Sequence, residues 1–150
     1  MKRRDREDFE ALIRELSADP RAQKMKEYIQ HGTVTTFDHS MDVARTSFSI
    51  NRKLHLRAPE KELVTAAFLH DYFPYDWHDH GDRLHGYHHP DIAAENAARD
   101  FAIGEKEADA IRSHMWPLTI TRTPRSRIAW IVTLADKLCS TRETIMERHA

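Results

Sequence analysis

Apolar residues recur every three to four positions along almost the whole chain, and no segment shows sustained alternation of apolar and polar residues. This spacing places apolar side chains on one face of an α-helix. The chain has only four glycines, which favours helices joined by short loops. The sequence therefore predicts an all-α fold, with helices over 5–17, 20–31, 36–55, 59–72, 90–101, 105–115 and 124–146.

Three prolines indicate where helices begin. Pro59, Pro90 and Pro124 each stand where a first helical residue is expected, because proline loses no needed hydrogen bond there and its φ is already helical. Thr123 is predicted to cap the last helix. Residues 73–90 mix aromatics, histidines and carboxylates without a helical stripe, which predicts an ordered loop.

Composition narrows the class of protein. Basic and acidic residues balance to a net charge of -1, so general nucleic-acid binding is not expected. No run approaches the ~18 apolar residues needed to span a bilayer, and the opening MKRRDREDFE lacks the apolar run of a signal peptide. The single cysteine, Cys139, cannot form an internal disulfide. These features predict a cytoplasmic protein with one domain, residues 1–150.

Ionisable residues stand on helix faces that should be buried. His70 lies three and seven positions after Ala67 and Leu63, and Asp71 follows Val64 by seven positions. A buried carboxylate loses its hydration and needs a cation or strong donors. This doublet at the end of an apolar helix therefore favours a bound cation.

The same logic applies to two other helices. Asp136 shares its face with Val132, and His39 is followed along one stripe by Val43. Mixed nitrogen and oxygen ligands suit Mn, Fe, Zn, Ni or Co, and no thiolate pair is present for a structural zinc finger. The sequence predicts a divalent metal held by His39, His70, Asp71 and Asp136. The alternative is core histidines bonded to backbone carbonyls, with the aspartates capping helices or pairing with Arg45 or Arg142.

The order of these residues resembles a known family. His39 lies in HSMDVAR, the doublet closes AAFLHD, and Asp136 lies in LADK. The ordered set resembles the HD superfamily of metal-dependent phosphohydrolases over about residues 36–145. The resemblance implies an HD-domain helical bundle of about six to seven helices, with the segment 5–31 packed on this core or mediating a homodimer.

Two further elements extend the resemblance. YHHPDIAAENA resembles the HP-containing helix of HD subfamilies with two metals, and IRSHMWP resembles their later histidine element. By that match His89 and His114 ligate a second divalent metal, and Asp71 bridges the two ions. His88 competes with His89, which could instead cap a helix, and His114 could be a buried structural histidine. Since YFPYDW follows the doublet and no GYP signature is present, the substrate of the cyclic-dinucleotide phosphodiesterases is not assigned.

The resemblance implies a phosphohydrolase that uses metal-activated water on a phosphomonoester or phosphodiester, such as a nucleotide or another small phosphorylated substrate. Asp71 and Lys137 are the predicted catalytic residues, the lysine because it adjoins a ligand and could face the phosphate. Further phosphate-binding candidates are Arg45, Arg112 and Arg142, for which surface solvation is the alternative. Candidates for stacking on a base or sugar are Tyr75, Trp77, Tyr87 and Trp116.

Two other functions fit the sequence. The six-residue ligand set also resembles that of the di-iron HD oxygenases, which would act here on a polyol or phosphonate. A non-catalytic, metal-binding signalling module is the third hypothesis. Of the remaining histidines, His85 is predicted to face the substrate or the ligands, His78 and His80 to lie on an exposed loop, and His31 and His55 to have no role.

Overall fold

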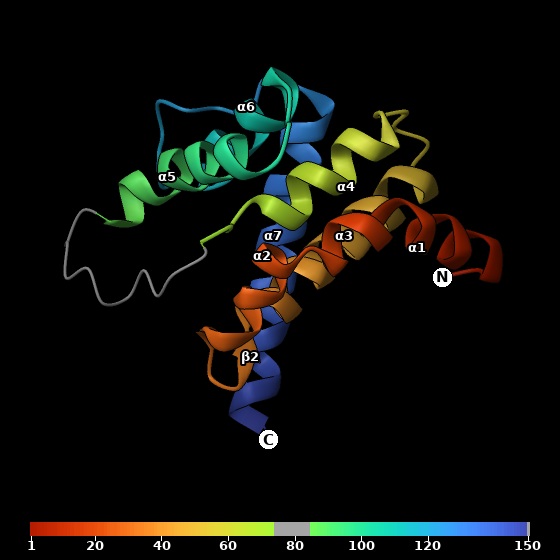
Figure 1. Ribbon diagram of the computed structural model, residues 1–150, viewed down its shortest axis with the longest axis horizontal. Coiled ribbons are helices and arrows are strands. Elements are labelled where there is room, and N and C mark those ends of the chain that lie inside the picture. The colour runs from red at the N-terminus through yellow and green to blue at the C-terminus, as the bar shows by residue number, and fades with distance from the viewer. Residues whose placement is uncertain (74–84, 150) are drawn as a thin grey trace.

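The computed structural model describes residues 1–73 and 85–149 (Figure 1). The first half contains α1 (Arg3–Ala18), α2 (Pro20–Gln23), the 3₁₀-helix η1 (Lys24–Glu27), β1 (Ile29–His31), β2 (Val34–Thr35) and α3 (Thr36–Lys53). The second half contains α4 (Glu60–Leu69), α5 (His85–Asp100), α6 (Glu105–Ser113) and α7 (Arg127–His149). The predicted all-α fold is confirmed, and one short hairpin is the only β-structure in these ranges.

The centre of the bundle consists of α3, α4 and α7, which pack against one another. α6 packs on α4 and α7, and α5 packs on α6. In Figure 1, α5 and α1 lie at opposite ends of the molecule. The largest apolar side chains of the core include Phe48, Leu63, Phe68, Phe73 and Ile111. None of the helices in the two described ranges is both long and apolar enough to cross a lipid bilayer.

The N-terminal helix uses its apolar face on the bundle. Phe9 and Ile13 are buried, and the Phe9 ring lies 5.6 Å from the ring of Phe48. Arg52 of α3 forms an ion pair of 2.7 Å with Asp5 of α1. Of the two roles predicted for this segment, the structure therefore supports packing on the core.

The predicted helix over 20–31 is wrong beyond its first half. β1 and β2 form an antiparallel pair in which Ile29 lies opposite Thr35. Gly32 makes the turn with φ of 51°, in the left-handed region that glycine enters without steric cost. The Thr35 side chain then accepts a hydrogen bond from the Asp38 backbone N–H, which fixes the start of α3.

The last helix begins later than its proline predicted. α7 starts at Arg127, and Pro124 lies before it as a buried residue. The Ser126 hydroxyl accepts a hydrogen bond of 3.0 Å from the Ala129 backbone N–H. Ser126 therefore makes the capping contact predicted for Thr123. Ala129 lies in the first turn of α7, where backbone N–H groups have no carbonyl partner within the helix.

Two other boundaries also differ from prediction. α5 begins at His85, so Pro90 lies inside this helix and not at its first position. Residues 85–90, which were predicted to belong to the loop over 73–90, are therefore helical. Proline in a second turn lacks the N–H that the carbonyl four residues earlier would accept. Pro59 precedes α4 as its N-cap residue, and α4 ends at Leu69. His70 and Asp71 consequently follow that helix.

Candidate metal centre

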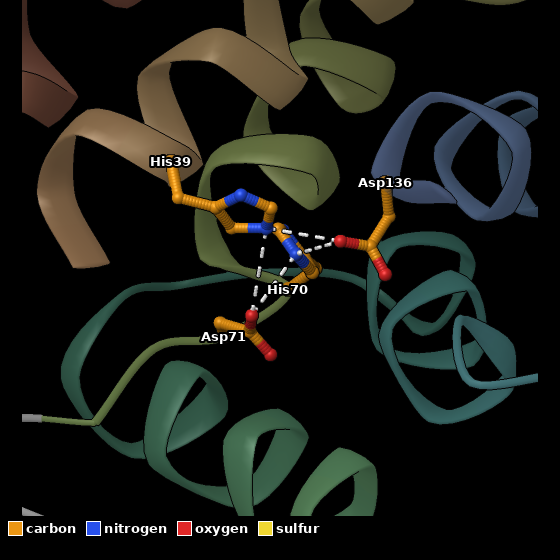
Figure 2. A group of neighbouring side chains, drawn as sticks. All are labelled: His39, His70, Asp71 and Asp136. Atoms are coloured by element: carbon orange, nitrogen blue, oxygen red, sulfur yellow. Dashed lines mark hydrogen bonds and ion pairs between the residues drawn. The ribbon is translucent and has the colours of Figure 1, made fainter. Parts of the chain in front are cut away.

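Four of the predicted ligands meet inside the bundle. His39 lies in the first turn of α3, His70 and Asp71 follow α4, and Asp136 lies in α7 (Figure 2). All four are buried, and one ligand atom from each lies within 4.8 Å of the others. His39 Nε2 is 2.9 Å from Asp136 Oδ1. His70 Nε2 is 3.2 Å from Asp71 Oδ2.

A second group adjoins the first through Asp71. His89 comes from α5, and His114 is the C-cap residue of α6. Their Nε2 atoms are 3.2 Å apart, and both side chains are buried. Two facing imidazole nitrogens need either a proton or a cation between them, since two lone pairs repel. The three residues form a separate set whose ligand atoms could hold a metal ion.

The two oxygens of Asp71 face different histidine pairs. Oδ2 lies 3.2 Å from His70 Nε2 and 3.8 Å from His39 Nε2. Oδ1 lies 3.0 Å from His89 Nε2 and 3.4 Å from His114 Nε2. A carboxylate placed in this way can serve both groups at once. The structure thus brings the six predicted ligands together, with Asp71 between the two sets.

Hydrogen bonds behind the imidazoles direct their Nε2 atoms inward. His70 Nδ1 donates to the Ala67 carbonyl oxygen at 2.6 Å, and His114 Nδ1 donates to the Ile111 carbonyl oxygen at 2.7 Å. A proton held on Nδ1 leaves the Nε2 lone pair available for a metal. His70 Nε2 is buried and makes no hydrogen bond within the described part of the chain. These inward-facing Nε2 atoms therefore fit a metal ligand set better than a set of structural histidines.

Sequence reasoning missed two residues that hold the ligands. Glu143 of α7 places its carboxylate oxygens 3.0 and 2.9 Å from His39 Nδ1, and Gln30 of β1 donates to Asp71 Oδ2 at 2.9 Å. Glu143 follows Asp136 by seven positions, so the helix-face argument could have found it. Gln30 gave no such signal, because its segment was predicted to be helical.

In this cluster, burial and neighbouring charges shift the pKa values in opposite directions. Burial acts to lower the pKa of His39, but the carboxylates of Asp136 and Glu143 outweigh it and raise that pKa to about 9. Burial acts to raise the pKa of Asp71, yet His70 and the neighbouring histidines hold it well below its usual range. The pKa of Asp136 is lowered in the same way. The carboxylates are therefore charged at neutral pH and need positive charge from imidazolium groups or a metal cation.

A cavity of about 600 Å³ opens beside both groups. Its lining residues are Gln30, Asp71, His89, His114, Met115, Pro117, Leu118, Asp136, Lys137 and Ser140. Lys137 is the only lysine or arginine among these described residues, and its Nζ donates to the His114 carbonyl oxygen at 3.3 Å. Burial lowers the pKa of Lys137, while the charge of Asp136 acts in the opposite direction. The cavity thus joins the ligand atoms to one cationic side chain.

The arginines predicted as phosphate-binding candidates lie elsewhere. Arg45 stacks over the Phe9 ring, 5.7 Å from its centroid. Arg112 pairs with Glu105 at 2.8 Å, and Arg142 pairs with Asp42 at 2.6 Å. None of the three lines the cavity. Within the described part of the chain neither Arg45 nor Arg142 pairs with Asp71 or Asp136, so the predicted alternative in which these arginines neutralise the aspartates does not hold.

The other candidates divide between described and undescribed residues. The Trp116 ring packs 5.2 Å from the Trp130 ring, and His55 is exposed. Predictions for Tyr75, Trp77, His78 and His80 fall outside the described residues. The side chains of His31, His85, Tyr87 and His88 also lie outside the described part of the chain. Of His88 and His89, the structure describes the imidazole of His89 alone, and this imidazole lies in the cluster.

A family model described as the HD domain matches residues 36–141. The chain belongs to the HD-domain family. The matched segment of this HD domain includes all six clustered residues and leaves out α1. Searches of curated proteins and of solved structures found no significant match. HD domains are typically metal-dependent hydrolases, and the buried histidine–aspartate groups fit that chemistry.

Proposed function

We propose that this HD domain is a metal-dependent phosphohydrolase, which cleaves a small phosphomonoester or phosphodiester with metal-activated water. The observation that carries the proposal is the position of Asp71. Its two oxygens face two separate histidine pairs at the wall of a cavity that also contains Lys137. Shared carboxylates of this kind suit paired metals that act on a phosphate group.

The residues divide into two ligand groups in this proposal. His39, His70, Asp71 and Asp136 would hold one divalent ion, and Asp71 would share a second ion with His89 and His114. Mn, Fe, Co, Ni and Zn all accept such nitrogen and oxygen donors. When bound, the metal supplies an activated water and neutralises charge on the phosphate.

The chain itself positions the reacting groups. The Nδ1 hydrogen bonds of His39, His70 and His114 hold the imidazoles in one orientation, so that they need not reorganise during the reaction. Lys137 would bind a phosphate oxygen, since its ammonium group lies at the cavity wall. The apolar wall formed by Met115, Pro117 and Leu118 would face the organic part of the substrate.

The first experiment counts metals in protein purified without a chelator or a histidine tag. We expect two metals per chain in the wild type and about one in His89→Ala and His114→Ala. His55→Asn is the matched control, because His55 is exposed and lies outside both ligand groups. An unchanged metal content in the two alanine variants would remove His89 and His114 from the site.

The second experiment measures hydrolysis of p-nitrophenyl phosphate, bis(p-nitrophenyl) phosphate and a nucleotide panel with each candidate metal. Lys137→Met should raise KM more than it lowers kcat, because it removes a contact made to the bound phosphate. Lys53→Met is the control, since this exposed lysine lies outside the cavity. Absence of hydrolysis with every metal would contradict the proposal.

A di-iron oxygenase is the second candidate. The observation that favours it is the same six-residue set, because nitrogen and oxygen donors around a shared carboxylate also suit two irons. Predominantly iron in the purified protein, together with oxygen consumption that depends on a polyol or phosphonate, would support this candidate. Full phosphatase activity with zinc or manganese alone would contradict it.

A further inference from the structure

Gln30 is the extra residue of a β-bulge in the hairpin that precedes α3. Ile29 of β1 pairs with Thr35 of β2. The next pair joins His31 to Val34, so the chain advances two residues along β1 and only one along β2. A bulge bends its strand and redirects a side chain, and bulges are frequent beside functional sites. Here the bulged residue lines the cavity beside the metal centre.

The side-chain amide of Gln30 is held at both of its polar atoms. Its Nε2 donates to Asp71 Oδ2 at 2.9 Å, and its Oε1 accepts from the Thr36 hydroxyl at 3.4 Å. An ionised carboxylate can only accept, so the amide nitrogen is the atom that faces Asp71. The backbone is also fixed, because the Thr36 N–H donates to the Tyr28 carbonyl oxygen at 2.8 Å. The hairpin thus presents an oriented donor to the carboxylate between the two ligand groups.

This hydrogen bond acts on one oxygen of Asp71. Each carboxylate oxygen has two lone-pair sites, so the Gln30 amide uses one site of Oδ2 and leaves the other for a metal ion. With Oδ2 held in this way, Oδ1 faces His89 and His114, at 3.0 and 3.4 Å from their Nε2 atoms. The contact from Gln30 therefore favours a carboxylate that gives one oxygen to each ligand group.

The two ligand groups depend on Asp71 to different extents. One group also contains Asp136 and two histidines, so it keeps three ligands if Asp71 turns away. The other group consists of His89, His114 and Asp71, which is its only carboxylate among the described residues. Carboxylates bind metal ions through one oxygen or through both. An Asp71 that rotated to give both oxygens to the first group would leave the second group without a negative ligand.

We propose that Gln30 is a positioning residue, which keeps Asp71 bridging with one oxygen for each metal and so determines whether the second metal binds. This inference rests on the paired metals of the proposed function. It also makes the β1–β2 hairpin part of the metal centre, although the hairpin precedes the segment 36–141 that the HD-domain model matches.

Titration of the metal-free full chain with Zn²⁺, in competition with a chromophoric chelator, tests this role without any substrate. We expect two binding steps in the wild type. Gln30→Met keeps the side-chain length but removes the donor, so it should weaken the weaker step by about 10-fold or more and leave the tighter step nearly unchanged. Gln23→Met is the matched control, because Gln23 is also half-buried and donates to the Ser17 carbonyl oxygen at 2.6 Å, away from both ligand groups.

Two further variants assign the effect to the second metal. His89→Ala should remove the weaker step, so adding Gln30→Met to it should not change the affinity for the remaining metal. Thr36→Val removes the hydroxyl that orients the amide and should weaken the same step by a smaller factor. Electron paramagnetic resonance with Mn²⁺ gives an independent readout: we expect a magnetically coupled pair in the wild type and in Gln23→Met, and isolated ions in Gln30→Met.

The outcomes separate this inference from the proposed reaction. Equal weakening of both steps in Gln30→Met would indicate a general structural role, and no change in either step would indicate no role; each result would overturn the inference. The expected shift in a protein that hydrolyses no phosphoester would support the role of Gln30 and refute the phosphohydrolase. A single binding step in the wild type would overturn the paired metals and this role together.

Discussion

Glu143 offers the sharpest test of how the fold prepares the metal ligands. Both of its oxygens lie within hydrogen-bond distance of His39 Nδ1, at 3.0 and 2.9 Å, and both side chains are buried. A hydrogen bond to a charged group contributes about 1.5–3 kcal/mol, which corresponds to a factor of about 10–100 in affinity. Loss of a partner behind a metal-bound histidine costs a similar factor.

We therefore expect Glu143→Ala to weaken metal binding by about 100-fold, because His39 loses both its orientation and the nearby negative charge. Glu143→Gln should weaken binding by about 10-fold, since an amide oxygen still accepts the Nδ1 hydrogen but carries no charge. The assay is competition for Zn²⁺ or Co²⁺ with a chromophoric chelator at fixed pH and salt.

Glu107→Gln is the matched control for this experiment. Glu107 is also a buried glutamate, and its carboxylate accepts the Gly104 backbone N–H at the start of α6. It lies outside both ligand groups, so its replacement should lower stability without changing the metal dissociation constant. Metal affinity within about twofold of wild type in both Glu143 variants would refute the proposed role of this hydrogen bond.

Four further predictions concern stability and reactivity. Phe48→Ala should lower the free energy of unfolding by about 3–5 kcal/mol in urea titrations, because it leaves a cavity at a fully buried site; a loss below about 1 kcal/mol would contradict this. Tyr72→Phe should lower the free energy of unfolding by about 1–2 kcal/mol, since the Tyr72 hydroxyl donates a hydrogen bond to Asp100 at 2.6 Å. The hydrogen bonds of Arg99 and Tyr72 lower the pKa of Asp100 to about 2, so the stability it contributes is present above about pH 4 and lost as pH falls toward 2; the difference between wild type and Asp100→Asn should shrink over that interval. Burial raises the pKa of Cys139 to about 12, so iodoacetamide at pH 8 should modify it only after denaturation, and rapid labelling of the native protein would contradict its burial.

The central role of Asp71 follows from its place at the end of α4. If α4 continued to residue 72, as the sequence predicts, the Asp71 carboxylate would lie on the same helical face as Val64. The structure ends α4 at Leu69, so Asp71 lies in the following turn and reaches both histidine pairs. A change in the length of this helix would therefore disturb both ligand groups together.

Much of the fold was predictable because helical periodicity is a local property. The spacing of apolar residues located α3, α4, α6 and α7 within a few residues. The hairpin of β1 and β2 was missed, since Ala22 and Met25 fit a helical stripe and both are indeed buried. The turn of this hairpin depends on the positive φ of Gly32, and the spacing of apolar residues does not predict that φ.

The sequence by itself determined that several polar residues face inward, because a histidine or aspartate on an apolar helical face is visible within a few turns of one helix. His39, His70 and Asp136 were identified in this way. Only the tertiary structure decided which atoms meet: Asp71 divides its oxygens between two groups, and Lys137 reaches the cavity. These contacts join residues far apart in the chain, so they depend on how the helices pack, which periodicity within a single helix does not encode.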